Sequence, residues 1–253
     1  MAEKAMHVIT RDRYDAVLFD LDGVLTDTAK LHAACWKQMF DEYLQKRATE
    51  RGEAFRPFDL ANDYRLYVDG KPRFDGVRDF LTSRGIQLPE GSPDDPPQID
   101  TVCGLGNRKN QLVNEVIHER GVEPYEGSVK LIERLRHDGF KIAVVTSSQN
   151  CGTVLKAARL DAFFEARVDG NMMRAQNLAG KPAPDTYLAA AKLLGVEPAR
   201  SIVVEDAIVG VEAGHKGKFG LVVGVARKGN AEELRQHGAQ VVVNDLGELV
   251  PTD

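Results

Sequence analysis

Two carboxylates separated by one residue follow the first apolar segment of the chain. The segment is residues 14–20, and the carboxylates are Asp20 and Asp22, with Gly23 directly after them. Like charges this close repel one another unless a cation lies between them. Carboxylate oxygens suit Mg²⁺, which proteins usually bind together with a substrate phosphate. One carboxylate could then attack phosphorus as a nucleophile, and the other could transfer a proton as a general acid/base.

Three further polar groups come later in the chain, each at the end of a predicted strand or in a loop. The first is Thr146, Ser147 and Ser148, with Asn150 close behind. The second is Lys181 in "GKPAPD", and the third is the pair Glu205 and Asp206. A lysine and a threonine hydroxyl could hold phosphoryl oxygens, and the acidic pair could complete a metal site. Each group alone is more typical of a polar turn, a helix cap or a solvated charge. All of them in this order, at the same expected edge of a sheet, favour one phosphoryl-transfer site.

Five short runs rich in β-branched residues predict the strands that would position these groups. They are residues 14–20, 140–146, 201–206, 220–225 and 240–245. Runs that are apolar on both faces are typical of a parallel sheet covered by helices on both sides. Residues 127–139 and 184–195 lie between these runs, have helical periodicity and end in glycine. This alternation predicts a doubly wound, Rossmann-like α/β fold.

Residues 28–123 do not follow the alternation. Residues 28–48 contain neither Gly nor Pro and predict a long amphipathic helix whose apolar stripe includes Leu31, Cys35, Met39 and Tyr43. A short helix is expected near residues 77–83 and another at about 107–120 with Asn107 as its N-cap, while the proline-rich stretch 88–100 predicts an exposed loop. We therefore expect an α/β core of residues 1–29 and 124–253. A helical cap of residues 30–123, with an extended insertion at about 46–101, would interrupt it.

The composition excludes several classes of protein. The chain has 253 residues, of which 43% are hydrophobic and 28% charged, as in ordinary soluble proteins. Its net charge of −5 gives no general attraction to nucleic acid or to an anionic membrane. No apolar run reaches the roughly 18–20 residues of a transmembrane helix, and no signal peptide is recognisable. The three scattered cysteines form neither a disulfide framework nor a zinc motif. We expect a cytoplasmic protein that is monomeric or weakly dimeric.

The order of the motifs resembles that of the haloacid dehalogenase (HAD) superfamily of phosphotransferases. The helical insert directly after the first motif is similar to that of members with a small α-helical cap. In the core, the resemblance covers roughly residues 14–31 and 124–245. It implies four catalytic roles: a nucleophile, Asp20; a general acid/base, Asp22; and two groups that hold the phosphoryl group, Thr146 and Lys181.

The same resemblance implies Mg²⁺ as the cofactor. The side chains of Asp20 and Asp206 would bind the ion, with Glu205 nearby and the backbone carbonyl of Asp22 as a further ligand. A dehalogenase is disfavoured, because its nucleophile needs neither a second aspartate nor magnesium.

Finer details resemble the β-phosphoglucomutase-like subfamily. In "DGVLTDTAKLHAACW", Thr28 and His32 stand where that subfamily has a threonine and a histidine leading into the cap. The histidine of the subfamily couples cap closure to the positioning of the general acid/base. Gly23 would give the backbone room to turn beside the phosphate.

Two other segments resemble the part of this subfamily that holds a second, non-transferring phosphate. In "TSSQN", Ser148 and Asn150 match its contacts, with Ser147 beside them. "GLGNRKNQL" resembles the cap segment whose arginine grips the same phosphate, which points to Arg108. The alternative for Arg108 is an ordinary surface position in the first turn of a helix.

The resemblance implies a small-molecule substrate, a sugar phosphate. The leading hypothesis is interconversion of β-glucose 1-phosphate and glucose 6-phosphate through an aspartyl-phosphate. A sugar-phosphate phosphatase of the same superfamily would share every core residue and stays open. A phospho-receiver or sensor is a non-enzyme alternative, disfavoured by the large cap. The chain departs from the subfamily in its long segment 46–101, and no residue clearly matches the second cap lysine, for which Lys71 and Arg73 are candidates.

Overall fold

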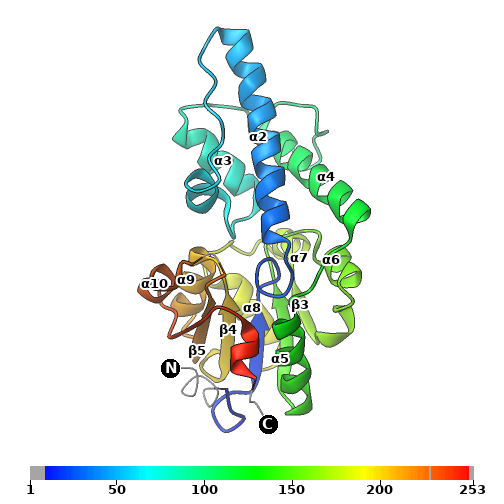
Figure 1. Cartoon of the computed structure of the whole chain (residues 1–253), viewed down its shortest axis with the longest axis vertical. Coiled ribbons are helices and arrows are strands. Elements are labelled where there is room, and N and C mark those ends of the chain that lie inside the picture. The colour runs from blue at the N-terminus through cyan, green and yellow to red at the C-terminus, as the bar shows by residue number, and fades with distance from the viewer. Residues whose placement is uncertain (1–8, 228, 251–253) are drawn as a thin grey trace. The chain divides into compact units, whose positions relative to one another are not determined.

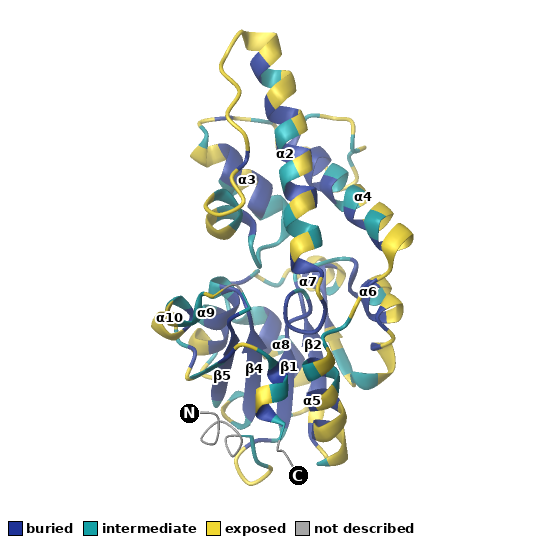
Figure 2. Ribbon diagram, in the orientation of Figure 1, coloured by how far each residue is buried: buried dark blue, intermediate teal, exposed yellow. Residues whose placement is uncertain are grey.

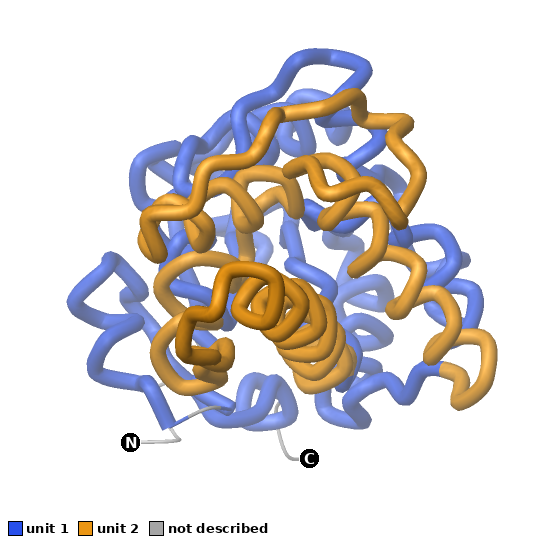
Figure 3. The backbone as a smooth tube through the Cα atoms, turned by 90° about the horizontal axis from the view of Figure 1, so that it is seen from above, with its two compact units in different colours: residues 1–27, 122–253 blue, residues 28–121 orange. Residues whose placement is uncertain are grey.

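The computed structural model describes residues 9–227 and 229–250, which form two compact units (Figure 3). One unit contains the described residues up to Asp27 and from Val122 onward, and the other is Thr28–Gly121. Among the described residues, no helix is both long enough and apolar enough to cross a membrane.

A parallel sheet is the centre of the first unit (Figure 1). Within the described residues it has six strands in the order β3-β2-β1-β4-β5-β6. They are β1 (Ala16–Phe19), β2 (Lys141–Val145), β3 (Ala166–Val168), β4 (Ser201–Glu205), β5 (Leu221–Val225) and β6 (Val241–Val243). This order confirms the predicted doubly wound α/β fold. The edge strand β3 was missed because its three residues include the charged Arg167 and form no apolar run.

The strand order places β1 between β2 and β4. Phe19 at the end of β1 pairs with Val144 of β2 and with Val204 of β4, so these three strands end at the same edge of the sheet. The order of strands reverses at β1 and β4, and a doubly wound sheet binds its ligands at such a reversal, beyond the carboxyl ends of the strands. The residues that follow β1, β2 and β4 are therefore placed where a ligand would bind.

Helices bury both faces of the sheet. The apolar side chains of β1 alternate, so that Ala16 and Leu18 join a cluster with α8, α9 and α10, while Val17 and Phe19 point to the other face. The strands are buried and the outer helix faces are exposed (Figure 2). The helices of this unit are α5 (Glu126–His137), α6 (Cys151–Ala157), α7 (Gly170–Gln176), α8 (Asp185–Leu194), α9 (Ile208–Lys216) and α10 (Ala231–Gln236).

The second unit is helical and has an aromatic core. Its helices are α2 (Ala29–Arg51), α3 (Arg73–Ser83) and α4 (Val102–Arg120), with a π-helical turn at Tyr64–Val68. The long helix α2 confirms the helix predicted from residues 28–48. In the core, the ring of Phe40 lies 5.3 Å from that of Trp36, 5.0 Å from Phe58 and 4.1 Å from Phe80, measured between centroids.

The predicted start of the last cap helix is wrong. Helix α4 begins at Val102, and its N-cap is Thr101, whose hydroxyl accepts a hydrogen bond from the backbone N–H of Gly104 at 2.9 Å. Asn107 therefore lies inside the helix, and Arg108 is not in its first turn. Close packing explains the two glycines in the first turns of α4, Gly104 and Gly106. A Cβ on Gly104 would overlap the Ile99 carbonyl, and one on Gly106 would overlap the Phe74 ring. Likewise, α3 begins at Arg73 rather than near residue 77.

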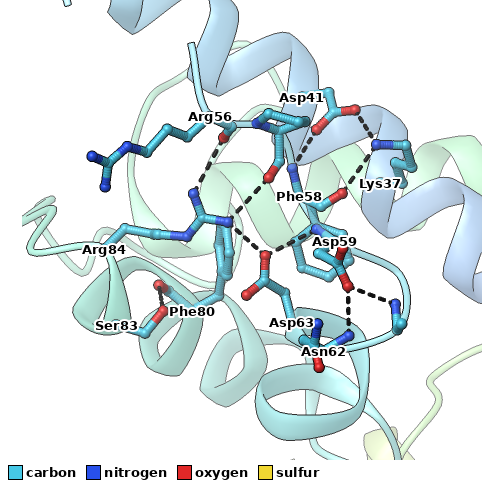
Figure 4. Close-up of polar contacts among 12 residues, drawn as sticks. Lys37, Asp41, Arg56, Phe58, Asp59, Asn62, Asp63, Phe80, Ser83 and Arg84 are labelled. Carbon is cyan, nitrogen blue, oxygen red and sulfur yellow. Dashed lines mark hydrogen bonds and ion pairs between the residues drawn. The ribbon is translucent and has the colours of Figure 1, made fainter. Parts of the chain in front are cut away.

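Hydrogen bonds hold the first part of the insertion in a defined path (Figure 4). Asp41 of α2 accepts a hydrogen bond from the backbone N–H of Phe58 at 2.7 Å. Arg84 donates to the carbonyls of Arg56 and Pro57 and to the carboxylate of Asp63, the last at 2.6 Å. The segment between α2 and α3 is thus tied to both helices.

The loop 88–100 is largely exposed, as predicted. Its start is fixed by α4, because Val102 and Cys103 donate their backbone N–H groups to the carbonyls of Pro89 and Glu90, each at 3.0 Å.

The aromatic core predicts a stability effect. Phe40 is fully buried, so Phe40→Ala should lower the free energy of unfolding by about 3–5 kcal/mol, since it leaves a cavity among three rings. Trp36 is the only tryptophan of the chain, so its fluorescence during urea unfolding reports on this unit. The control is Phe55→Ala, because Phe55 is 39% exposed, and its effect should stay within about 0.5 kcal/mol. Equal effects of the two changes would contradict this description of the core.

Candidate active site

A buried lysine lies between two carboxylates that follow β1 and end β4. Lys181 stands in the loop before α8 and donates to Asp20 Oδ1 at 2.5 Å and to Glu205 Oε1. Asp20 follows β1 directly, and Glu205 is the last residue of β4. All three side chains are buried. The structure thus joins two strand ends of the sheet through one ammonium group.

Glu205 accepts hydrogen bonds from four donors. Besides Lys181, the hydroxyl of Tyr187 donates to Oε1 at 2.8 Å. The backbone N–H groups of Asp206 and Ala207 donate to Oε2 at 3.1 and 3.2 Å. Ala207 is the N-cap residue of α9, so the carboxylate lies at the positive end of that helix. Tyr187 was not singled out from the sequence, because an aromatic residue on a helix face usually only fills the core.

Asp206 is packed against the loop after β1. Gly23 has a φ of +89°, and a Cβ at this position would overlap the Asp206 carboxylate. Only a glycine both adopts this backbone conformation readily and lets the two segments approach this closely. On the other side, the hydroxyl of Thr146, directly after β2, lies 3.4 Å from Asp22 Oδ2. The loop with Asp20 and Asp22 is therefore bordered by the residues that follow both neighbouring strands.

The segment after β2 forms a tight turn into α6. The backbone N–H of Ser148 donates to the Thr146 hydroxyl, and that of Asn150 donates to the Ser148 hydroxyl, both at 3.1 Å. Asn150 is buried at the N-cap of α6, while Ser147 and Ser148 are partly exposed. These side chains lie in the same unit as Asp20, and they follow the strand that pairs with β1.

Three of the carboxylates could hold a metal ion together. Asp20, Glu205 and Asp206 each offer an oxygen within 4.8 Å of the others. Because Glu205 accepts hydrogen bonds from four donors, Asp20 and Asp206 are the better placed of the three to bind a cation. Two buried carboxylates are the oxygen donors that a hard divalent cation prefers.

The balance of charge in this group favours a bound cation. Burial raises the pKa of Asp20 well above its usual value, and the charges of Glu205, Asp206 and Asp22 raise it further, while Lys181 opposes this shift. Burial alone would lower the pKa of Lys181, but Asp20 and Glu205 outweigh it and raise that pKa. Lys181 therefore carries its positive charge, and one ammonium group faces several carboxylates.

Thr28, His32 and Arg108 belong to the helical unit. Thr28 is buried just before α2 and accepts the backbone N–H of His32 at 2.8 Å. Lys109, which is buried on α4, lies with Nζ 2.7 Å from Nδ1 of His32 and 5.0 Å from the ring centroid of Trp36. An ammonium group can only donate, so Nδ1 accepts and the proton of a neutral His32 is on Nε2. Lys109 was not singled out from the sequence, which predicted that the helix begins only at about Asn107.

The three other cap cations that the sequence singled out have partners within the helical unit. Arg108 donates to the carbonyl of Pro97 at 2.7 Å and to the carboxylate of Asp100 at 3.2 Å. The two residues that were candidates for a second cap cation are also bonded within this unit: Lys71 donates to Asp79 at 2.6 Å, and Arg73 donates to Asn107 at 2.7 Å.

Comparison with known proteins identifies the family. Residues 14–217 match the family described as haloacid dehalogenase-like hydrolase. A protein of Mycobacterium tuberculosis named Beta-phosphoglucomutase is 53% identical over 242 residues, which cover 94% of this chain and 92% of that protein.

Two solved structures are similar as well. The β-phosphoglucomutase from Clostridium difficile has a TM-score of 0.73 at 25% identity and covers 93% of both chains. A hydrolase from Pseudomonas syringae has a TM-score of 0.72 at 25% identity and covers 93% of this chain and 95% of that one. The chain is therefore an enzyme of the haloacid dehalogenase superfamily and belongs to its β-phosphoglucomutase-like subfamily.

Proposed function

We propose that this enzyme interconverts β-glucose 1-phosphate and glucose 6-phosphate through a phosphoryl group carried on Asp20, with Mg²⁺ as its cofactor. The observation that carries the chemistry is the buried contact of Lys181 with Asp20 at the end of β1, beside Asp206. The choice of substrate is supported by the 53% identity with the mycobacterial protein named Beta-phosphoglucomutase.

Asp20 and Asp206 would hold the Mg²⁺ ion through their side chains, with the backbone carbonyl of Asp22 as a further ligand. Their chemistry fits the ion, since both are oxygen donors and both are buried. When bound, the ion supplies positive charge that offsets the carboxylates and the phosphoryl oxygens. Glu205 would act beside the ion by holding Lys181 and the backbone of Asp206.

The proposed reaction begins with the phosphoryl group on Asp20. A sugar hydroxyl oxygen attacks phosphorus, the bond between Asp20 and phosphorus breaks, and Asp22 takes the hydroxyl proton. The resulting sugar bisphosphate turns round, and Asp20 accepts its other phosphoryl group while Asp22 returns the proton to the leaving oxygen. Lys181 and the Thr146 hydroxyl hold the transferring phosphoryl oxygens during both steps.

The second phosphate of the bisphosphate needs its own contacts. We assign these to Ser148 and Asn150 in the core unit, with Ser147 beside them, and to Arg108 in the helical unit. The carbonyl of Pro97 holds Nε of Arg108, which fixes the plane of the guanidinium. His32, hydrogen-bonded to Lys109, and Thr28 at the start of α2 are proposed to link the helical unit to the placement of Asp22.

A sugar-phosphate phosphatase is the second candidate. The similarity to the hydrolase from Pseudomonas syringae favours it, because hydrolysis would use the same core residues. The difference is the group that attacks the aspartyl-phosphate: a sugar hydroxyl in the mutase and a water molecule in the phosphatase.

The products of one assay separate the two candidates. The enzyme is given β-glucose 1-phosphate, Mg²⁺ and a trace of glucose 1,6-bisphosphate, and glucose 6-phosphate and free phosphate are measured together. We expect glucose 6-phosphate as the main product and no turnover once a chelator removes the metal. Mainly free phosphate would establish the phosphatase instead, and full activity in the presence of the chelator would contradict the proposed cofactor.

Lys181 should be essential for turnover. Lys181→Met keeps the length of the side chain but removes the charge that stabilises the phosphoryl oxygens, so kcat/KM should fall by roughly 10²–10³. Lys192→Met is the control, because Lys192 lies exposed on the adjacent helix α8, and its kcat/KM should equal that of the wild type. Circular dichroism of both variants checks the fold. Wild-type turnover of Lys181→Met would contradict the role given to this residue.

A further inference from the structure

The Glu205 carboxylate has a fixed position. It is fully buried, and its Oε2 accepts the backbone N–H groups of Asp206 and Ala207. A Cβ on Gly210 of α9 would overlap this carboxylate, so the backbone of the helix lies directly against it. Because Oε2 is bonded to the backbone and the helix lies against the carboxylate, the position of Oε1 is fixed as well.

Two donors share that oxygen. The Lys181 ammonium and the Tyr187 hydroxyl both donate to Oε1, the hydroxyl at 2.8 Å. Lys181 also donates to Asp20 Oδ1 at 2.5 Å, so the ammonium is divided between two carboxylates. Because a second donor on Oε1 satisfies part of its negative charge, the hydroxyl weakens the attraction of Glu205 for Lys181. How strongly Glu205 competes with Asp20 for the Lys181 ammonium thus depends on the Tyr187 hydroxyl.

Packing fixes the Tyr187 hydroxyl. The residue is fully buried on α8, and its ring meets the ring of Phe219 edge-on, with 6.0 Å between the centroids. Nζ of Lys181 lies 5.1 Å from the centroid of the Tyr187 ring. A phenylalanine would keep these ring contacts and lose the hydroxyl alone. The chain therefore allows the hydroxyl to be tested without a change in the core.

We propose that Tyr187 is a positioning residue, whose hydroxyl holds Glu205 Oε1 so that Lys181 stays directed at Asp20 and at the phosphoryl group. This inference rests on the proposed phosphoryl transfer at Asp20. Lys181 stabilises charge on the phosphoryl oxygens as the group moves, which is a property of the transition state. Loss of the hydroxyl is thus expected to lower kcat and to leave the KM for the sugar phosphate nearly unchanged.

The test compares Tyr187→Phe with the wild type, using β-glucose 1-phosphate and, as a donor independent of the sugar, p-nitrophenyl phosphate. With both compounds kcat should fall about tenfold, as expected for a lost hydrogen bond to a charged group, while KM stays the same. Tyr14→Phe is the matched control. Tyr14 is buried in the same unit, and its hydroxyl lies 3.4 Å from the carbonyl of Gly220, so its kcat should equal that of the wild type.

A double-mutant cycle tests whether Tyr187 acts through Glu205. In a Glu205→Gln background, adding Tyr187→Phe should lower kcat far less than tenfold, because the shared acceptor is already altered. Two results would overturn the inference. One is a wild-type kcat in Tyr187→Phe. The other is a kcat of the double variant that falls by the full product of the two single effects. If the wild type transfers phosphate from neither compound, the proposed function fails and the inference fails with it.

Discussion

The candidate active site depends on a buried ammonium group that lies between buried carboxylates. Removing ions from water costs several kcal/mol for each, and this cost is offset only where the charges are paired and fully hydrogen-bonded. Lys181 meets this condition through Asp20 and Glu205, yet it is one positive charge beside three buried carboxylates, since Asp206 adjoins them. A further cation would stabilise a site with this excess of negative charge, which supports the proposed Mg²⁺. Burial raises the pKa of Asp20 most, and the neighbouring carboxylates Glu205, Asp206 and Asp22 raise it further.

The fold makes this crowding possible by backbone placement. Strand β1 lies between β2 and β4, so Asp20 follows the centre of the sheet and meets residues from both neighbours. Two glycines also allow the backbone to lie directly against two of the carboxylates, because a Cβ at either position would overlap a carboxylate. Gly23 lets the loop after β1 lie against Asp206, and Gly210 lets α9 lie against Glu205. The chemistry thus depends on residues without side chains as well as on the charged ones.

Much of this arrangement could be predicted from the sequence, because strand ends are local features. Asp20 and Glu205 come directly at the ends of apolar runs, and runs in a doubly wound sheet end at one edge. The contacts made by packing could not be predicted in the same way. Tyr187 reads as a core aromatic until its hydroxyl is seen on Glu205. Lys109 lies on a helix that was predicted to begin at about Asn107, whereas the helix begins at Val102. Gly104 lies inside this helix, where a Cβ would overlap the Ile99 carbonyl.

In the proposed mechanism, Asp20 carries the phosphoryl group. The most direct measurement is the mass of the proteolytic peptide that contains Asp20, taken after brief incubation with glucose 1,6-bisphosphate and Mg²⁺ and rapid acid quenching. We predict that the peptide gains the mass of one phosphoryl group, that borohydride converts the modified Asp20 to homoserine, and that Asp20→Asn shows neither change. Turnover of substrate with a peptide that is never modified, or with the phosphoryl group on another residue, would contradict this role of Asp20.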